Sequence, residues 1–305
     1  MADNSTKEEM KKLTERLEQG ILDFMDGEKF KTYLRTVSKF HNYSLNNTIL
    51  IALQKPDATY VTGYRTWQSM GRNVKPGEKG LKIFAPSSYT VKKEKPKIDP
   101  ATQQVELDDN GNPIMITVTQ KISSFHPISV FDVSQTEGEE LDLELIHELD
   151  GSVEQYENMF DAIKDVSPVP VIMENITTGA KGYFDGYKIA VNNGMSEAQT
   201  VKTALHELAH AMHEHHGIKL PGVRLSRNAK EVEAESTAFI VANHFGIDTS
   251  DYSFGYLASW STGKDIKELK SSLDKIRKVA SDMIASLEEK MKEKIQSKEE
   301  IVQAI

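Results

Sequence analysis

The residues best suited to chemistry in this sequence form the pentapeptide His206-Glu207-Leu208-Ala209-His210. On a helix, this spacing places the two imidazoles one turn apart on one face, where both can reach a single divalent ion. Glu207 then lies beside the open coordination position, where a carboxylate can take a proton from water and pass it to a leaving amine. The motif predicts one Zn²⁺ per chain, with Glu207 as the catalytic base.

Two predicted helices must position this motif and supply a further ligand. Apolar residues on both sides of the motif predict a helix over residues 196–216, and a second helical pattern covers residues 229–245. A catalytic zinc site takes three protein ligands and keeps one position open. Glu231 and Glu235 share one face of the second helix, so either can be the third ligand, and the other would orient His206 or His210.

Other residues contribute little to the predicted site. The sequence contains no cysteine, so the metal must be held by histidine and carboxylate side chains. His213, His215 and His216 follow the motif, but they lie past the expected helix end. We predict that they are solvent-exposed histidines, which the dipole at a helix C-terminus favours.

The motif and the following helix resemble zincin peptidases of the gluzincin type, specifically the ImmA/IrrE group. In that group the ligand glutamate precedes an Ala/Asn-x-Phe-Ala run, and Glu235 followed by Phe239 is similar. The resemblance implies that Glu235 is the third ligand. Glu231 is the alternative, because other gluzincins place the ligand four residues ahead of a carboxylate that holds the first histidine.

Composition bounds the class of protein. The chain has 305 residues, 38% of them apolar and 27% charged, which is typical of a globular protein of two domains. The N-terminus enters a charged amphipathic pattern directly, and the longest apolar run is far short of a membrane span. We therefore predict a cytoplasmic protein with no membrane partner. The net charge of −9 argues against nonspecific nucleic-acid binding by the whole chain.

The charge is unevenly distributed, and one window is basic. Between Lys55 and Lys97, cations outnumber carboxylates and alternate with aromatic residues, a composition that favours a groove for stacked bases and phosphates. The competing interpretation is a set of cations on a helix face with a tryptophan in the core. The candidate nucleic-acid contacts are Arg65, Trp67, Arg72, Lys75, Lys79 and Lys82.

The order of motifs in this half resembles the N-terminal domain of ArdC-type antirestriction proteins. The matching pieces are Ser44-x-Asn46-Asn47, Tyr64-x-x-Trp67 and Lys75-x-Gly77-Glu78-Lys79-Gly80. The resemblance implies an α+β chain in which a mixed helix and sheet domain that binds single-stranded DNA precedes a zincin-like domain. The acidic stretch after residue 136, which has little core material, predicts a linker at 137–152 between a first domain at 7–136 and a zincin-like domain with its long C-terminal helix at 153–297.

The remaining pattern predicts the scaffold of both halves. Residues 94–113 predict an exposed excursion with an acidic tip that protrudes from a sheet. A long helix over about 264–295 either packs on its own domain or forms a coiled coil, and its mixed spacing favours packing. Strand patterns, rich in β-branched and aromatic residues, lie at 81–85, 89–91, 114–118 and 128–133.

The combined resemblance predicts a zinc-dependent, metallopeptidase-like antirestriction factor of a mobile element that protects incoming DNA. The implied partners are single-stranded DNA and a protein substrate or host restriction component. Two alternatives stay open. One is a non-catalytic DNA-binding protection protein with a structural metal, and the other is an ImmA-like regulatory protease that cleaves a repressor. Glu207 favours a hydrolytic site, because a purely structural metal needs no general base.

Overall fold

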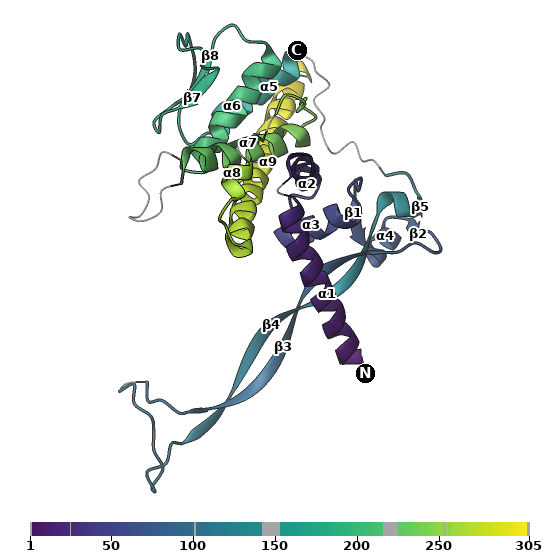
Figure 1. Cartoon of the computed structure of the whole chain (residues 1–305), viewed down its shortest axis with the longest axis vertical. Helices are drawn as coiled ribbons and strands as arrows, with labels where there is room; N and C mark the ends of the chain where they lie inside the picture. The colour runs from purple at the N-terminus through teal and green to yellow at the C-terminus, as the bar shows by residue number, and fades with distance from the viewer. Residues whose placement is uncertain are drawn as a thin grey trace.

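The chain folds into two halves that both combine helices with small sheets, as the computed structural model shows (Figure 1). The structure describes residues 2–24, 26–100, 102–141, 153–215, 225–252, 254–255 and 257–303. The mixture of elements confirms the predicted α+β class. Within these ranges, no helix is both long enough and apolar enough to cross a membrane.

Three helices build the N-terminal core: α1 (Ala2–Asp23), α2 (Gly27–Lys39) and α3 (Leu45–Gln54). Asp26 caps α2 by accepting from the Glu28 N–H, and Ser44 caps α3 by accepting from the Asn47 N–H. Each helix buries one apolar face, so the three form a platform for the strands that follow. The buried side chains include Leu13, Leu17, Ile21, Phe30, Leu34, Val37, Ile49, Leu50 and Ile51.

A long twisted hairpin projects from this platform (Figure 1). Strand β3 (Leu81–Pro96) pairs antiparallel with β4 (Met115–Asp132), and β1 (Val61–Gly63) pairs with the end of β4 near the core. The sequence predicted four short strands here, because the middle of β4 is polar and lacks the alternation of a half-buried strand. Backbone pairing alone sustains the ribbon there. The predicted excursion is the hairpin tip, which holds the isolated bridges Ile98↔Val105 and Leu107↔Pro113.

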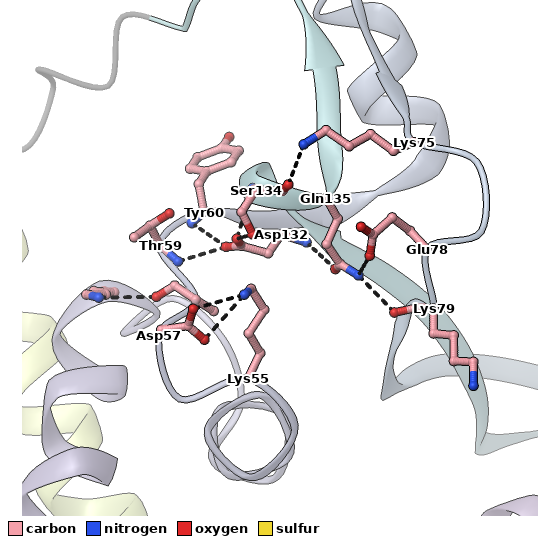
Figure 2. A network of polar contacts seen from close by, with 12 residues as sticks. Lys55, Asp57, Thr59, Tyr60, Lys75, Glu78, Lys79, Asp132, Ser134 and Gln135 are labelled. Atoms are coloured by element: carbon pink, nitrogen blue, oxygen red, sulfur yellow. Dashed lines mark hydrogen bonds and ion pairs between the residues drawn. The ribbon is translucent and has the colours of Figure 1, made fainter.

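Short elements complete the N-terminal half. They are α4 (Tyr64–Ser69), β2 (Arg72–Val74), the 3₁₀ helix η1 (Val133–Gln135) and β5 (Thr136–Gly138). Strands β2 and β5 form a two-stranded antiparallel sheet. The loop between β2 and β3 therefore returns beside η1, where side-chain hydrogen bonds hold it (Figure 2).

The described part of the C-terminal half contains five helices and one three-stranded sheet, on which α6 packs. The sheet order is β6 (Val171–Glu174), β8 (Ile189–Asn192), β7 (Gly182–Phe184), so β7 lies at an edge. The helices that position the motif are α6 (Glu197–Met212) and α7 (Arg227–His244), close to the predicted ranges. The others are α5 (Val153–Val166), the short α8 (Leu257–Ser261) and α9 (Ile266–Gln303). Helix α9 packs on α5 and α7, which confirms the predicted packing.

The two halves share a continuous apolar core, because α2 packs on α7 and α1 packs on α9. Polar contacts accompany this packing: the Asn243 amide donates to the Ser38 hydroxyl at 2.7 Å, and the Arg277 guanidinium donates to the His41 carbonyl at 3.2 Å. The domain boundaries at 136 and 153 stay predictions. Most of the proposed linker, residues 142–152, lies outside the described residues.

Candidate functional site

Helices α6 and α7 bring the predicted metal-binding residues together. Ser196 caps α6 by accepting from the Gln199 N–H, and Ser226 caps α7 by accepting from the Ala229 N–H. Helices α6 and α7 pack on each other, and both carry small, fully buried residues, which allow a close approach. They include Ala209 of α6 and Ala234 and Ala238 of α7. Side chains from one turn of α6 and one turn of α7 then point to the same position.

Three side-chain atoms converge at that point. The Nε2 atoms of His206 and His210 are 3.1 Å apart, and the Glu231 Oε2 atom lies 3.5 Å from the first and 3.6 Å from the second. Bonds of about 2.1 Å in a tetrahedral zinc site separate ligand atoms by about 3.4 Å. The three residues therefore fit a single Zn²⁺-sized ion with one coordination position left for a substrate or water.

Glu235 takes a different place from the one predicted. Its Oε2 atom lies 3.0 Å from His206 Nδ1, on the side of the ring that faces away from the three converging atoms. The geometry favours the alternative in which the two carboxylates exchange roles. Glu231 has the position of a ligand, and Glu235 has the position of a residue that would orient the His206 ring and hold its proton on Nδ1. We carry this revised assignment forward as a proposal.

Glu207 lies beside the site without joining the three converging atoms. It is 9% exposed, and burial raises the pKa of its carboxyl against the opposing effect of His206 and His210. The Phe184 backbone N–H donates to the carboxylate. Gly182 allows this approach, because a Cβ there would lie 2.6 Å from the Thr203 methyl and 3.3 Å from the Glu207 side chain. Strand β7 and the catalytic candidate are thus in direct contact.

The carboxylates give the site an anionic character. Burial would lower the pKa of His206, but Glu231, Glu235 and Glu207 together raise it to about 10. The same contacts with His206 and His210 hold the pKa of Glu231 well below its usual range. Three carboxylates beside two imidazoles favour a bound cation, which matches the geometric fit.

Two hollows meet at this site. Gly182, His206 and Glu207 line both of them, and one extends along Tyr252 while the other extends along Tyr183. An elongated substrate could therefore pass on both sides of Glu207.

His213 and His215 are not the solvent-exposed residues that the sequence predicted. Each is 2% exposed, because the chain turns back after α6 and packs both rings against α7. Glu233 of α7 faces both rings, with Oε2 at 3.5 Å from His213 Nδ1 and 3.2 Å from His215 Nε2. His216 lies outside the described residues. The sequence pattern did not indicate this cluster, because it singled out Glu231 and Glu235 and not Glu233, which stands between them in the sequence.

The candidate nucleic-acid contacts separate into structural and exposed residues. Trp67 is fully buried, and its indole N–H donates to the Phe131 carbonyl at 2.9 Å, so it is a core residue and not a stacking platform. The Arg72 guanidinium is engaged with Thr136 and Glu139 at the β2–β5 sheet. These two predicted contacts serve the fold.

The three predicted lysines differ in the same way. Lys82 forms an ion pair with Glu9 at 2.8 Å, and Lys75 donates to the Ser134 carbonyl at 3.0 Å. In Figure 2 the ammonium of Lys79 points away from the polar network, while its backbone carbonyl accepts from Gln135 at 2.9 Å. The Lys-x-Gly-Glu-Lys-Gly loop is thus braced by its backbone and presents one lysine outward.

Four aromatic and basic residues of this region are exposed. Arg65 and Lys79 are exposed, and so are Tyr60 and Tyr64, at 37% and 47%. Both tyrosines lie beside the Trp67 core: Tyr60 packs edge-on against Trp67 with ring centroids 5.5 Å apart. The sequence pattern contained these tyrosines but gave no means of separating exposed from buried aromatic residues.

Comparison with known families agrees with this architecture. Residues 3–124 match the N-terminal domain of the anti-restriction factor ArdC, and residues 165–282 match the IrrE N-terminal-like domain of the peptidase M78 family. The chain combines an ArdC-type N-terminal domain with an IrrE-like domain. The resemblance drawn from the sequence motifs is thereby confirmed for both halves, and the second match covers both helices that carry the metal-binding candidates.

Individual proteins are also similar to this chain. An uncharacterized Bacillus anthracis protein, pXO2-81, is 28% identical over 94% of this chain and 52% of its own length, so the chain spans about half of that relative. Two crystal structures of the antirestriction protein ArdC from the R388 plasmid, one metal-free and one Mn(II)-bound, are 18% identical to this chain. The matches cover 81% and 82% of this chain and 85% of each ArdC chain, with TM-scores of 0.45 and 0.47.

Proposed function

We propose that this ArdC-type chain is a zinc-dependent, metallopeptidase-like antirestriction factor of a mobile element, which binds single-stranded DNA and protects incoming DNA. The observation that carries the hydrolytic part is the convergence of His206, His210 and Glu231 at 3.1–3.6 Å with Glu207 beside them. A structural site is usually closed by four protein ligands, whereas this one has three and a neighbouring base.

The side chains divide the chemistry between them. When bound, Zn²⁺ would polarise a substrate carbonyl and lower the pKa of a water molecule to about 7. Glu207 accepts the proton of the attacking water and returns it to the leaving amine, which a carboxylate with a raised pKa does more readily. Glu235 keeps the His206 ring in one tautomer throughout.

An extended peptide is the substrate class that the surroundings favour. Strand β7 is at the edge of its sheet and lines the hollow beside Glu207. The outer side of an edge strand can pair with an extended chain. The peptide bond would then pass directly over Glu207, because Phe184 of β7 already contacts that carboxylate.

The ligand assignment predicts a graded response of metal content. We expect about one zinc per chain in the full-length protein, and loss of stoichiometric zinc in His206→Ala, His210→Ala and Glu231→Ala. Glu235→Ala removes only the group that orients His206, so zinc affinity should fall by about 10–100-fold. Elemental analysis after purification without added zinc, followed by chelator competition, measures both effects.

Two results would contradict this assignment. Stoichiometric zinc in the His206→Ala/His210→Ala double variant would exclude the site. Normal zinc content in Glu231→Ala with none in Glu235→Ala would return the ligand role to Glu235.

The nucleic-acid part of the proposal places single-stranded DNA on the exposed aromatic and basic side chains of the N-terminal half, which include Tyr60, Tyr64, Arg65 and Lys79. Exposed aromatic rings stack on bases of any sequence, and neighbouring cations neutralise phosphates. We expect Tyr64→Ala to weaken binding of an oligonucleotide by about 1–3 kcal/mol. Arg65→Ala should make the affinity less dependent on salt, by about 0.7 in the logarithmic slope.

Fluorescence anisotropy of the full-length protein with labelled single-stranded DNA, over a range of salt concentrations, measures both quantities. Lys278→Ala is the matched control, because Lys278 is an exposed cation on α9 in the other half, 64% exposed. Equal losses in Lys278→Ala and Arg65→Ala would show a diffuse charge effect and exclude these side chains as the binding site.

A further inference from the structure

Helix α6 ends in a turn that folds the chain back onto the metal-binding residues. Glu214 has the left-handed backbone conformation, with φ 55°, and its N–H donates to the Ala211 carbonyl at 2.9 Å. The next N–H, that of His215, donates to the His210 carbonyl at 3.1 Å. This pair of hydrogen bonds is a Schellman motif, which brings the residue after the left-handed position against the last turn of the helix. The ring of His215 therefore lies against the ring of His210.

A buried chain of contacts runs from His210 to α7. The Nδ1 atoms of His210 and His215 are 2.7 Å apart, and His215 Nε2 lies 3.2 Å from Glu233 Oε2. Lys275 of α9 donates to the same oxygen at 2.7 Å and balances the buried carboxylate. Two Nδ1 atoms at this distance share one proton, so one ring donates and the other accepts.

The direction of these hydrogen bonds follows from the site. The Nε2 atom of His210 is one of the three converging atoms. A metal ligand must present a lone pair on that atom, so the proton of the His210 ring is on Nδ1. His215 Nδ1 then accepts, and its own proton is on Nε2, where Glu233 accepts it. Each ring has one tautomer that satisfies every contact.

We propose that His215 and Glu233 are positioning residues that hold the His210 ring with Nε2 presented to the metal ion. The inference rests on the proposed function. It gives each histidine ligand a partner on α7: Glu235 holds His206 directly, and Glu233 holds His210 through the intervening imidazole.

A second metal ion bound by His213, His215 and Glu233 is the competing interpretation, because their ligand atoms lie within 4.8 Å of one another. The contacts argue against it. An ion on His215 Nε2 would leave that ring without a proton, since its Nδ1 already accepts from His210. The Lys275 ammonium also occupies the Glu233 oxygen that the ion would need.

The test compares zinc affinity in full-length variants, measured by competition with a chelator. His215→Phe keeps an aromatic ring but removes the acceptor for His210, and we expect about 10–100-fold weaker binding. His215→Asn retains an acceptor near the position of Nδ1 and should recover most of the affinity. The absorption spectrum of the Co²⁺-substituted protein should change in His215→Phe, because the orientation of the His210 ring changes.

His244→Phe is the matched control. His244 is also a buried histidine paired with a glutamate: it lies on α7 with its Nε2 at 2.8 Å from Glu288 of α9, away from the metal-binding residues. Its replacement should leave zinc affinity unchanged. Circular dichroism checks that each variant is folded.

Three results would overturn the inference. The first is wild-type zinc affinity and an unchanged Co²⁺ spectrum in folded His215→Phe. The second is two zinc ions per wild-type chain with one lost in His215→Phe, which would make the cluster a metal site. The third is zinc binding in the wild type that is insensitive to His210→Ala. That outcome refutes the proposed function itself, and the positioning role with it.

Discussion

Replacing Glu207 with glutamine is expected to lower peptide hydrolysis by about 10²–10⁴-fold while the protein keeps its fold and its metal. Glutamine has the same size as glutamate and can still accept from the Phe184 N–H, so the buried contacts of residue 207 are preserved. It cannot accept the proton of the attacking water. Because Glu207 does not belong to the three converging atoms, zinc content should match the wild type.

The experiment needs a hydrolysis assay and a zinc measurement on the same preparations. A peptide library analysed by mass spectrometry reports cleavage of any member, whichever sequence the site prefers. Glu197→Gln is the control, because Glu197 is an exposed glutamate in the first turn of the same helix. Cleavage at the wild-type rate in Glu207→Gln would remove Glu207 from the mechanism.

The same variant separates the classes of function that the sequence left open. Protection of incoming DNA from restriction can be compared in cells that carry the wild type or Glu207→Gln. Loss of protection with zinc retained would exclude a purely structural metal. Equal protection would show that antirestriction depends on the DNA-binding surface and not on hydrolysis, and it would leave the peptidase chemistry to another task.

The metal site shows what a sequence pattern can determine. On a helix, residues spaced like His206 and His210 must lie on one face, with Glu207 beside them. The motif therefore predicted which helix face carries the site and a role for each residue. Glu231 and Glu235 are equivalent by the same criterion, because both lie on one face of α7. Their roles depend on the lateral shift between α6 and α7, which is set by long-range packing and is not encoded in local spacing.

The turn after α6 could not be predicted from the sequence, for a different reason. Glycine is the residue that usually marks a left-handed helix end, and Glu214 occupies that position here. Without the glycine signal, the helix was predicted to run to residue 216 and the histidines beyond it were predicted to be exposed. The fold instead ends the helix at Met212 and buries His213 and His215.

Composition could not separate buried from exposed aromatic residues in the N-terminal half. Trp67 and Tyr64 are three residues apart and both fit a stacking platform by residue type. Helix α4 is short and packs against strands β1, β2 and β4. Trp67 is its buried residue. Only the direction of α4 relative to β4 decides which ring meets solvent.

This placement makes Trp67→Ala the largest expected change in stability. The side chain is fully buried, and truncating a buried tryptophan costs about 3–5 kcal/mol in the free energy of unfolding, because it removes apolar contacts and leaves a cavity. Tyr60 and the Phe131 carbonyl would lose their shared partner. Denaturant unfolding of the full-length protein should show a lower midpoint, and any loss of DNA binding should follow the loss of folded protein.

Trp67→Phe distinguishes the core role from the stacking role that the sequence allowed. Phenylalanine keeps an aromatic ring in the core but cannot donate to the Phe131 carbonyl, so we expect a smaller loss of about 1–3 kcal/mol. A stacking platform would be impaired in the folded protein, whereas a core residue would not. We therefore expect folded Trp67→Phe to bind single-stranded DNA like the wild type, while Tyr64→Ala binds weakly with unchanged stability. Equal weakening in the two folded variants would mean that the Trp67 ring reaches the bases after all, and that α4 reorients when DNA binds.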